Sequence, residues 1–409
     1  MEKSPRKKTR FVNGPINAMR LEGKINGIDK VFYNFMDIHY DVTNQTQCDD
    51  VRSLDIDNYL VKNFDKISES DKLYDFFFEI YPTAILTDPT MFKEKYIWNI
   101  NNLFKKSFHI NKDKNVVGKS NTFPNVRFHY IDIRDYMANG HKMLYELVSF
   151  IDIIIRDGNI LENDNIRIEN MLNSIFDQVN IIYNMFYKKK EQSKTTKLPP
   201  TITTEKYEEN IMIDKIKRFI DKIQNDYKHN EPKKIINKVI DTILHDAFDD
   251  FNKNYDEFKK KLSLLEDIAS IKSHDISFDK KNGIVLGVPR PNLQYTFYLL
   301  IELSSKLFKS CMLIFVILID LFFMRRFLDK DYVTNGISYT GASHSINYVY
   351  ILVKYFDFKI TNASYLKKDP KYIENEIKKA QHPHDIAELI VPNFVYQCSD
   401  MTDFPPHFD

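Results

Sequence analysis

The sequence predicts an α/β protein in which a mostly parallel central sheet is built from N- and C-terminal halves, with a large helical insertion between them. Three short apolar runs of strand character lie in the first third of the chain, separated by helical or loop connections that suit parallel crossovers. Helical spacing replaces this pattern over residues 142–282, and strand-like runs return after residue 335. We therefore expect two halves of one sheet around a helical block.

The composition is that of a soluble globular protein. The chain has 409 residues, of which 43% are hydrophobic and 28% charged, and its net charge of +1 gives no overall attraction to nucleic acid or an anionic membrane. Residues 1–15 form a basic tail, read as a flexible solvated segment or as a weak nucleic-acid or nuclear-import patch. No apolar segment follows this tail, so we expect a protein that is not secreted.

The three cysteines, Cys48, Cys311 and Cys398, are too few and too scattered to suggest a disulfide framework, and no two form a C-x-x-C pair. A reducing, intracellular compartment is the simplest interpretation. Neither a Walker loop nor a G-x-G-x-x-G turn occurs, so a glycine loop that cradles phosphates is not expected.

The N-terminal half spans residues 16–141. An edge hairpin over residues 16–30 leads into a strand at 31–38, and a short helix is expected at 60–67. The runs at 73–80 and 125–133 are the second and third strands.

The helical insertion spans residues 142–282, with an exposed loop at 188–204 that is rich in lysine and threonine. Apolar side chains recur there at helical spacing on several successive segments. The C-terminal half, 283–409, begins with a long apolar helix over 293–328, followed within 335–345 by a short strand that ends in a tight turn. A helix at 346–355 and a candidate last strand at 358–361 follow, before an extended, proline-rich tail. We interpret the apolar run 307–324 as a buried core helix, because Lys309 and Asp320 interrupt it and charges are costly in lipid.

Polar residues gather at the predicted strand ends. Asp37, His39 and Asp41 lie at the carboxyl end of the first strand, and Glu79 lies near the carboxyl end of the second. Ligands of open α/β sheets bind beyond the carboxyl ends of the strands, so these side chains are candidates for a shared site. Asp132 and Arg134 follow the third strand, and an internal salt bridge is their simplest interpretation.

A second cluster follows the late strand. Gly341 allows a sharp turn, Ser343 is a candidate cap, and His344 then lies at a helix N-terminus, where the dipole favours its neutral form. A neutral imidazole acts as a base, an electrophile or a metal ligand. The alternative is a capping turn with an incidental histidine.

These residues resemble the motifs of the TraB/Tiki, ChaN and erythromycin-esterase-like superfamily. Asp37-Ile38-His39 looks like a variant of the G-E-x-H strand end, with Met36 in place of the glycine, and Gly341-Ala342-Ser343-His344 looks like the late G-x-x-H motif. Phe78-Glu79 and Asp132-Ile133-Arg134 are similar to the acidic second and third strand ends. The resemblance implies an α/β core with a helical insertion and an activity among hydrolases, metalloproteases, haem-binding proteins and toxin domains. The composition also resembles uncharacterised proteins of giant, mimivirus-like viruses.

The leading hypothesis is a hydrolase-like protein in which Asp37, His39, Glu79 and His344 converge. Two mechanisms stay open: a divalent metal held by His39, Glu79 and His344, or metal-free catalysis with His39 as general base and an acid orienting it. The alternative is a non-catalytic viral structural or interaction protein on a degenerate copy of the same fold. The substrate and the oligomeric state do not follow from the sequence.

Overall fold

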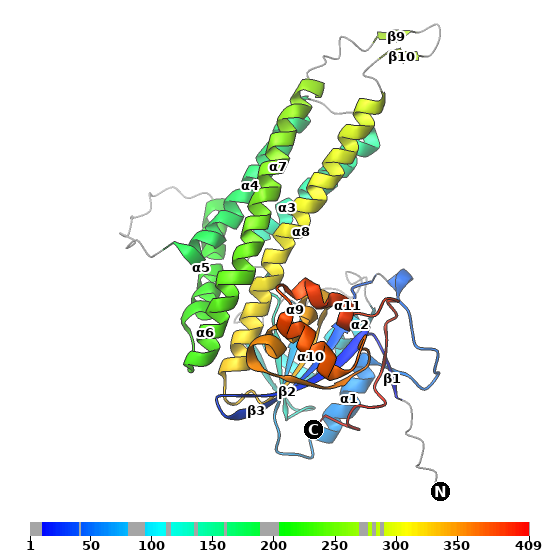
Figure 1. Ribbon diagram of the computed structural model, residues 1–409, viewed down its shortest axis with the longest axis vertical. Helices are drawn as coiled ribbons and strands as arrows, with labels where there is room; N and C mark the ends of the chain where they lie inside the picture. The colour runs from blue at the N-terminus through cyan, green and yellow to red at the C-terminus, as the bar shows by residue number, and fades with distance from the viewer. Residues whose placement is uncertain are drawn as a thin grey trace. The chain divides into compact units, whose positions relative to one another are not determined.

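The structure is a computed structural model that describes residues 10–40, 42–80, 95–111, 116–134, 138–158, 162–188, 204–269, 277–279, 284–286 and 290–408. The chain divides into two compact units (Figure 1). The first comprises 1–133, 222–238 and 319–409, and the second comprises 134–221 and 239–318.

The strand-like runs of the two chain halves meet in one six-stranded sheet of the first unit, with the order β12-β2-β3-β11-β5-β8. The strands are β2 (Asn17–Ile25), β3 (Ile28–Asp37), β5 (Tyr74–Phe78), β8 (Val126–Tyr130), β11 (Asn335–Gly341) and β12 (Lys359–Ala363). The four strands β3, β11, β5 and β8 run parallel, so their carboxyl ends share one edge. Inserting the late strand β11 between β3 and β5 brings the two halves of the chain together.

The sheet is mixed, which corrects the expectation of a mostly parallel one. A hairpin joins β2 and β3 in antiparallel fashion through Asn26 and Gly27, which both have positive φ, as a tight hairpin turn requires. This hairpin does not form the edge that we expected, because β12 pairs antiparallel with the outer side of β2. The candidate strand at 358–361 corresponds to β12, but local sequence signals did not place it beside β2.

Both faces of the sheet are buried, and the side chains alternate between them. Tyr33, Phe35, Phe76 and Phe78 join the core under α1 (Ile56–Ile67) and α2 (Lys95–Ser107). The alternate residues face α8 (Arg290–Asp329) and α9 (Ala342–Phe356). The Phe32 and Phe77 rings lie 5.5 and 4.8 Å from the Phe323 ring of α8. Two-sided burial explains why these strands appear as continuous apolar runs in the sequence.

The second unit is mainly helical (Figure 1). Its helices are α3 (Ala138–Asp157), α4 (Glu162–Tyr187), most of α5 (Thr204–Asn225), a π-helical turn (Ile240–Leu244), α7 (His245–Ala269) and the first part of α8 (Arg290–Asp329). α4 packs against both α3 and α7. Residues 189–203, which include most of the predicted loop at 188–204, lie outside the described residues.

Helix α8 contains the apolar run 307–324. Over Tyr295–Asp329 it is long and apolar enough to cross a membrane by length and composition, although 67% of its most apolar window is buried within the protein. The buried charges of α8 have partners: Asp320 contacts His344 and Asn347, and Arg325 pairs with Asp226. These pairs fit the predicted core helix, since a buried charge needs a compensating partner.

The chain ends differ from the expected loose tails. Residues 1–9 lie outside the described part, but β1 (Phe11–Asn13) already pairs with β4 (Leu54–Asp55) and with β13 (Cys398–Asp400). The C-terminal segment is not merely surface chain, because Phe408 is 4% exposed and its ring lies 4.8 Å from that of Tyr33. Aromatic burial outweighs the extended preference of the two preceding prolines.

Cys48 and Cys398 form a disulfide, which corrects the expectation of unpaired cysteines. The partners are 350 residues apart, so their spacing contains no signal of the bond. Among the described residues, Cys311 is a free, buried cysteine of α8.

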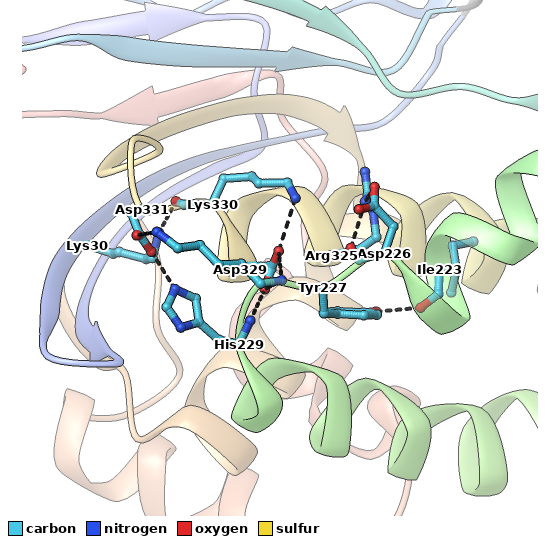
Figure 2. A network of polar contacts seen from close by, with 10 residues as sticks. Lys30, Ile223, Asp226, Tyr227, His229, Arg325, Asp329, Lys330 and Asp331 are labelled. Atoms are coloured by element: carbon cyan, nitrogen blue, oxygen red, sulfur yellow. Dashed lines mark hydrogen bonds and ion pairs between the residues drawn. The ribbon is translucent and has the colours of Figure 1, made fainter.

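Asp329, at the end of α8, accepts hydrogen bonds from the residues that directly precede α6 (Asn230–Val239), as Figure 2 shows. Its carboxylate accepts the backbone N–H groups of Lys228 at 2.8 Å and His229 at 2.9 Å. Asp331 pairs with both of their side chains. Burial alone would raise the pKa of Asp329, but the two backbone donors together with the Lys330 ammonium group outweigh burial and lower this pKa. The carboxylate thus stays ionised where the chain turns into α6.

We expect Asp329→Ala to lower the free energy of unfolding of the first unit by about 1–3 kcal/mol, because two backbone N–H groups then lose the buried carboxylate that accepts them. Urea unfolding followed by circular dichroism measures this change. Asp29→Ala is the matched control, since that side chain is 83% exposed and its carboxylate forms an exposed ion pair with Lys24 at 3.2 Å. An equal effect of the two substitutions would contradict the capping role.

Candidate active site

The site lies at the shared carboxyl edge of the parallel strands. Asp37 is the last residue of β3, Glu79 follows β5, and Gly341 ends β11, where α9 begins. Asp37 and Gly341 are register partners on neighbouring strands, and the Glu79 N–H reaches the Tyr339 carbonyl oxygen. Parallel pairing therefore delivers residues from three distant parts of the chain to one place.

Glu79 is the centre of the cluster, with an imidazole on each carboxylate oxygen. The Nε2 atom of His344 lies 3.1 Å from Oε1, and the Nε2 atom of His39 lies 3.3 Å from Oε2. The Gly341 N–H also donates to Oε2 at 2.7 Å. Burial would raise the pKa of Glu79, but the two imidazoles outweigh burial and hold it well below its usual range. Glu79 is therefore an ionised, buried carboxylate.

The cluster continues outward from both imidazoles. The Nδ1 atom of His344 lies 2.6 Å from Oδ1 of Asp320 on α8, and Asn347 donates to the other oxygen of Asp320. On the other side, the Nδ1 atom of His39 lies 3.5 Å from Oδ2 of Asp37. Acids and imidazoles thus alternate along a chain of five side chains, which we call the acid–imidazole chain: Asp37, His39, Glu79, His344 and Asp320.

One member of the acid–imidazole chain reaches the surface. The His39 side chain is 34% exposed, whereas the other four side chains are between 1% and 5% exposed. Among the five members of the acid–imidazole chain, solvent therefore reaches mainly the His39 side chain.

His344 differs electrostatically from the expectation of a neutral imidazole at a helix N-terminus. Burial alone lowers its pKa, but the carboxylates of Glu79 and Asp320 outweigh burial and raise the pKa of His344 to about 10. Two full charges in contact exceed the partial charge of the helix dipole. His344 is therefore an imidazolium that donates from both nitrogens.

Gly341 is needed for a different reason from the one we expected. Its φ of −59° is open to any residue, so no sharp turn demands glycine. A Cβ atom there would instead lie 2.9 Å from His39 Nε2 and 3.3 Å from Glu79 Oε2. Ser343 is exposed and caps nothing, because α9 begins at Ala342 with Gly341 as its N-cap residue.

Buried hydroxyl groups fix the start of α9 against the sheet. The Ser345 hydroxyl on α9 and the Ser338 hydroxyl on β11 both donate to the Asn34 side-chain oxygen, at 3.0 and 2.9 Å. Thr340 adds a contact to Ser345 at 3.0 Å. This network positions His344, which precedes Ser345 directly.

The other predicted supporting residues are Asp41, Asp132 and Arg134. Asp41 lies outside the described residues. Asp132 is 1% exposed beyond β8, and Arg134 falls in the second unit. Sequence reasoning missed Asp320, Asn347 and Gln397. Asp320 had a signal, a carboxylate within an apolar helix, and we used it only to argue against a membrane span.

The predicted metal set His39, Glu79 and His344 does meet, but not as a ligand set. Over the described ranges, no group of three His, Cys, Asp or Glu side chains is positioned to hold a metal ion. A ligating imidazole must present an unprotonated nitrogen, whereas both nitrogens of His344 face carboxylate oxygens. We therefore derive no chemistry through a metal.

A family profile described as "Family of unknown function (DUF5847)" matches residues 10–409. The chain belongs to this family. Its relatives include the uncharacterized proteins R706 and R161 of Acanthamoeba polyphaga mimivirus, which are 37% and 33% identical to it. The R706 alignment covers 98% of this chain and 97% of the relative, and the R161 alignment covers 97% and 98%.

No solved structure matches the chain. The family and its mimivirus members agree with the giant-virus resemblance of the sequence, whereas none of these matches is to the TraB/Tiki, ChaN and erythromycin-esterase-like superfamily. The names of these relatives assign no activity to them.

We predict that the His344 ring titrates far above pH 6.5, the value of a free histidine. Its folded pKa is raised, so its contribution to stability is complete below about pH 6.5 and disappears as the pH rises through about 10. NMR of protein with labelled histidines gives the midpoint, and the spectrum of His344→Gln assigns the resonance. A midpoint near 6.5 would refute the doubly paired imidazolium.

Gly341→Ala is expected to displace His39 from Glu79, since the added methyl group occupies the space of the imidazole edge. The same NMR experiment should show a shifted His39 resonance and a nearly unchanged His344 resonance. Ser343→Ala, on the same turn but exposed, is the control and should alter neither.

Proposed function

We propose that this protein is a metal-independent hydrolase of the esterase type, with His39 as the general base. The observation that carries the proposal is the acid–imidazole chain, which has one exposed member at the carboxyl edge of a parallel sheet. Buried ionisable groups are costly, and clusters of them with strongly shifted pKa values concentrate at active sites.

The geometry supports a role for each member. The His39 Nε2 and Glu79 Oε2 atoms lie 3.3 Å apart at the exposed end of the acid–imidazole chain, so a water molecule that binds beside this pair is within hydrogen-bond reach of both atoms. Its oxygen then attacks the ester carbonyl carbon while His39 Nε2 takes its proton. The tetrahedral intermediate expels the alcohol, which receives that proton from His39.

The buried members keep His39 in a reactive state. Asp37 faces its Nδ1 atom and orients the ring, and ionised Glu79 stabilises the imidazolium that forms. His344 and Asp320 hold Glu79 in place and balance its charge. The first N–H groups of α9 lack a side-chain cap, and such groups are suited to a developing oxyanion.

The Asp37-Ile38-His39 and Gly341–His344 segments resemble motifs of a superfamily that includes the erythromycin-esterase-like hydrolases. The proposal agrees with this resemblance. The Met36 departure does not enter the acid–imidazole chain, since Met36 is fully buried within β3. The second candidate is a non-catalytic interaction protein. In that case the acid–imidazole chain only fastens α8 and α9 to the sheet, through His344 and its two carboxylates.

We predict that His39→Ala reduces hydrolysis of short-chain p-nitrophenyl esters by about 10²–10⁴-fold, the usual contribution of a general base. Glu79→Gln should reduce it by at least tenfold, because the amide cannot stabilise an imidazolium. Initial rates at pH 7–8 measure both effects.

The matched control is His384→Ala, since that histidine is 79% exposed and contacts only its neighbour Asp385 among the ion pairs found in the described chain. Metal analysis should find no bound metal ion in the active purified protein. Addition of a chelator should leave the hydrolysis rate unchanged. Absence of turnover in the wild type across an ester panel, or equal rates for all three variants, would favour the interaction protein. Loss of activity on chelation would contradict the metal-free mechanism.

A further inference from the structure

Gln397, near the C-terminus, reaches the acid–imidazole chain at Asp37. Its side-chain N–H₂ group donates to Asp37 Oδ1 at 3.1 Å and to the Ile38 carbonyl oxygen at 3.3 Å. The Ile38 N–H also donates to Oδ1, at 2.8 Å, which leaves Oδ2 facing His39. Gln397 is fully buried, so this division of the Asp37 oxygens does not depend on solvent.

A covalent bond lies next to Gln397. Its backbone N–H donates to the Thr46 hydroxyl at 2.7 Å, and the Thr46 N–H returns a contact to the Gln397 side-chain oxygen at 3.4 Å. The next residue, Cys398, is bonded to Cys48, two residues beyond Thr46. The disulfide therefore closes a small ring of contacts around the group that orients Asp37.

We propose that Gln397 is a positioning residue for His39 and that the Cys48–Cys398 disulfide holds it there, so that the state of the site depends on the oxidation state of this pair. Without the bond, the Thr46 segment and β13 are joined by the paired hydrogen bonds of Gln397 and by their separate contacts with β1. Movement of Gln397 frees Oδ1 of Asp37, the carboxylate turns, and His39 Nδ1 loses a fixed partner.

The chemistry is a two-electron thiol–disulfide exchange. A dithiol such as dithiothreitol becomes a cyclic disulfide, while the sulfurs of Cys48 and Cys398 take up two electrons and two protons. Both cysteines are half-buried, so a small reductant reaches them, whereas Cys311 is fully buried on α8. Such a bond persists in oxidising surroundings and is reduced in a reducing cytoplasm.

The test compares oxidised and reduced wild-type protein with Gln397→Ala, with the double variant Cys48→Ser/Cys398→Ser, and with Cys311→Ser as the matched control. Alkylation and mass spectrometry count the free thiols, and NMR of labelled histidines reports on His39, assigned from His39→Ala. We expect one free thiol before reduction and three after, a shifted His39 resonance on reduction, and the same shift in Gln397→Ala and in the double variant without reductant. Cys311→Ser should respond to reduction as the wild type does.

The activity readout rests on the proposed function, whereas the NMR readout does not. If the protein hydrolyses esters, reduction should lower the rate several-fold in wild type and Cys311→Ser but not in the double variant. If it hydrolyses none, a His39 shift still supports this inference while the hydrolase proposal fails. A His39 resonance that is the same in oxidised, reduced and Gln397→Ala protein would overturn the inference about Gln397 and the disulfide. Alkylation of Cys48 and Cys398 before reduction would overturn it as well.

Discussion

The buried carboxylate of Glu79, held between two imidazoles, is the interaction on which the rest of the site depends. An isolated carboxylate in that position would be costly to ionise, and the two rings together with the Gly341 N–H supply what solvent would otherwise provide. Each ring in turn contacts a further acid. Removing any interior member leaves a neighbouring charge uncompensated, so the stability of each member of the acid–imidazole chain depends on the others.

The fold serves this interaction by placing four parallel strand ends at one edge and two helices beside it. β3, β5 and β11 bring Asp37, Glu79 and Gly341 together, and α8 and α9 supply Asp320 and His344. Aromatic side chains bury both faces of the sheet, which limits movement of the strand ends. A rigid base with an exposed imidazole at its edge is an arrangement that suits catalysis better than a flexible loop does.

The disulfide and Gln397 link this site to the C-terminal segment. The same segment carries β13 and the buried Phe408, so the end of the chain contributes to the sheet core and to the site. Reducing the disulfide or substituting Gln397 therefore provides a test of the position of His39 that leaves every member of the acid–imidazole chain in place.

The sequence by itself determined the strands of the six-stranded sheet, with their hairpin, and the long helices. It also supplied four of the five members of the acid–imidazole chain as candidates, because periodicity and strand-end residues are local properties. Tertiary structure alone decided the order of the strands, the antiparallel edge, the role of Asp320 and the disulfide. It also decided the charge of His344: its position at a helix start indicated a neutral ring, and the opposite result comes from two acids 24 and 265 residues away. Such partners meet only through long-range packing, and a pKa depends on distance in space rather than on distance along the chain.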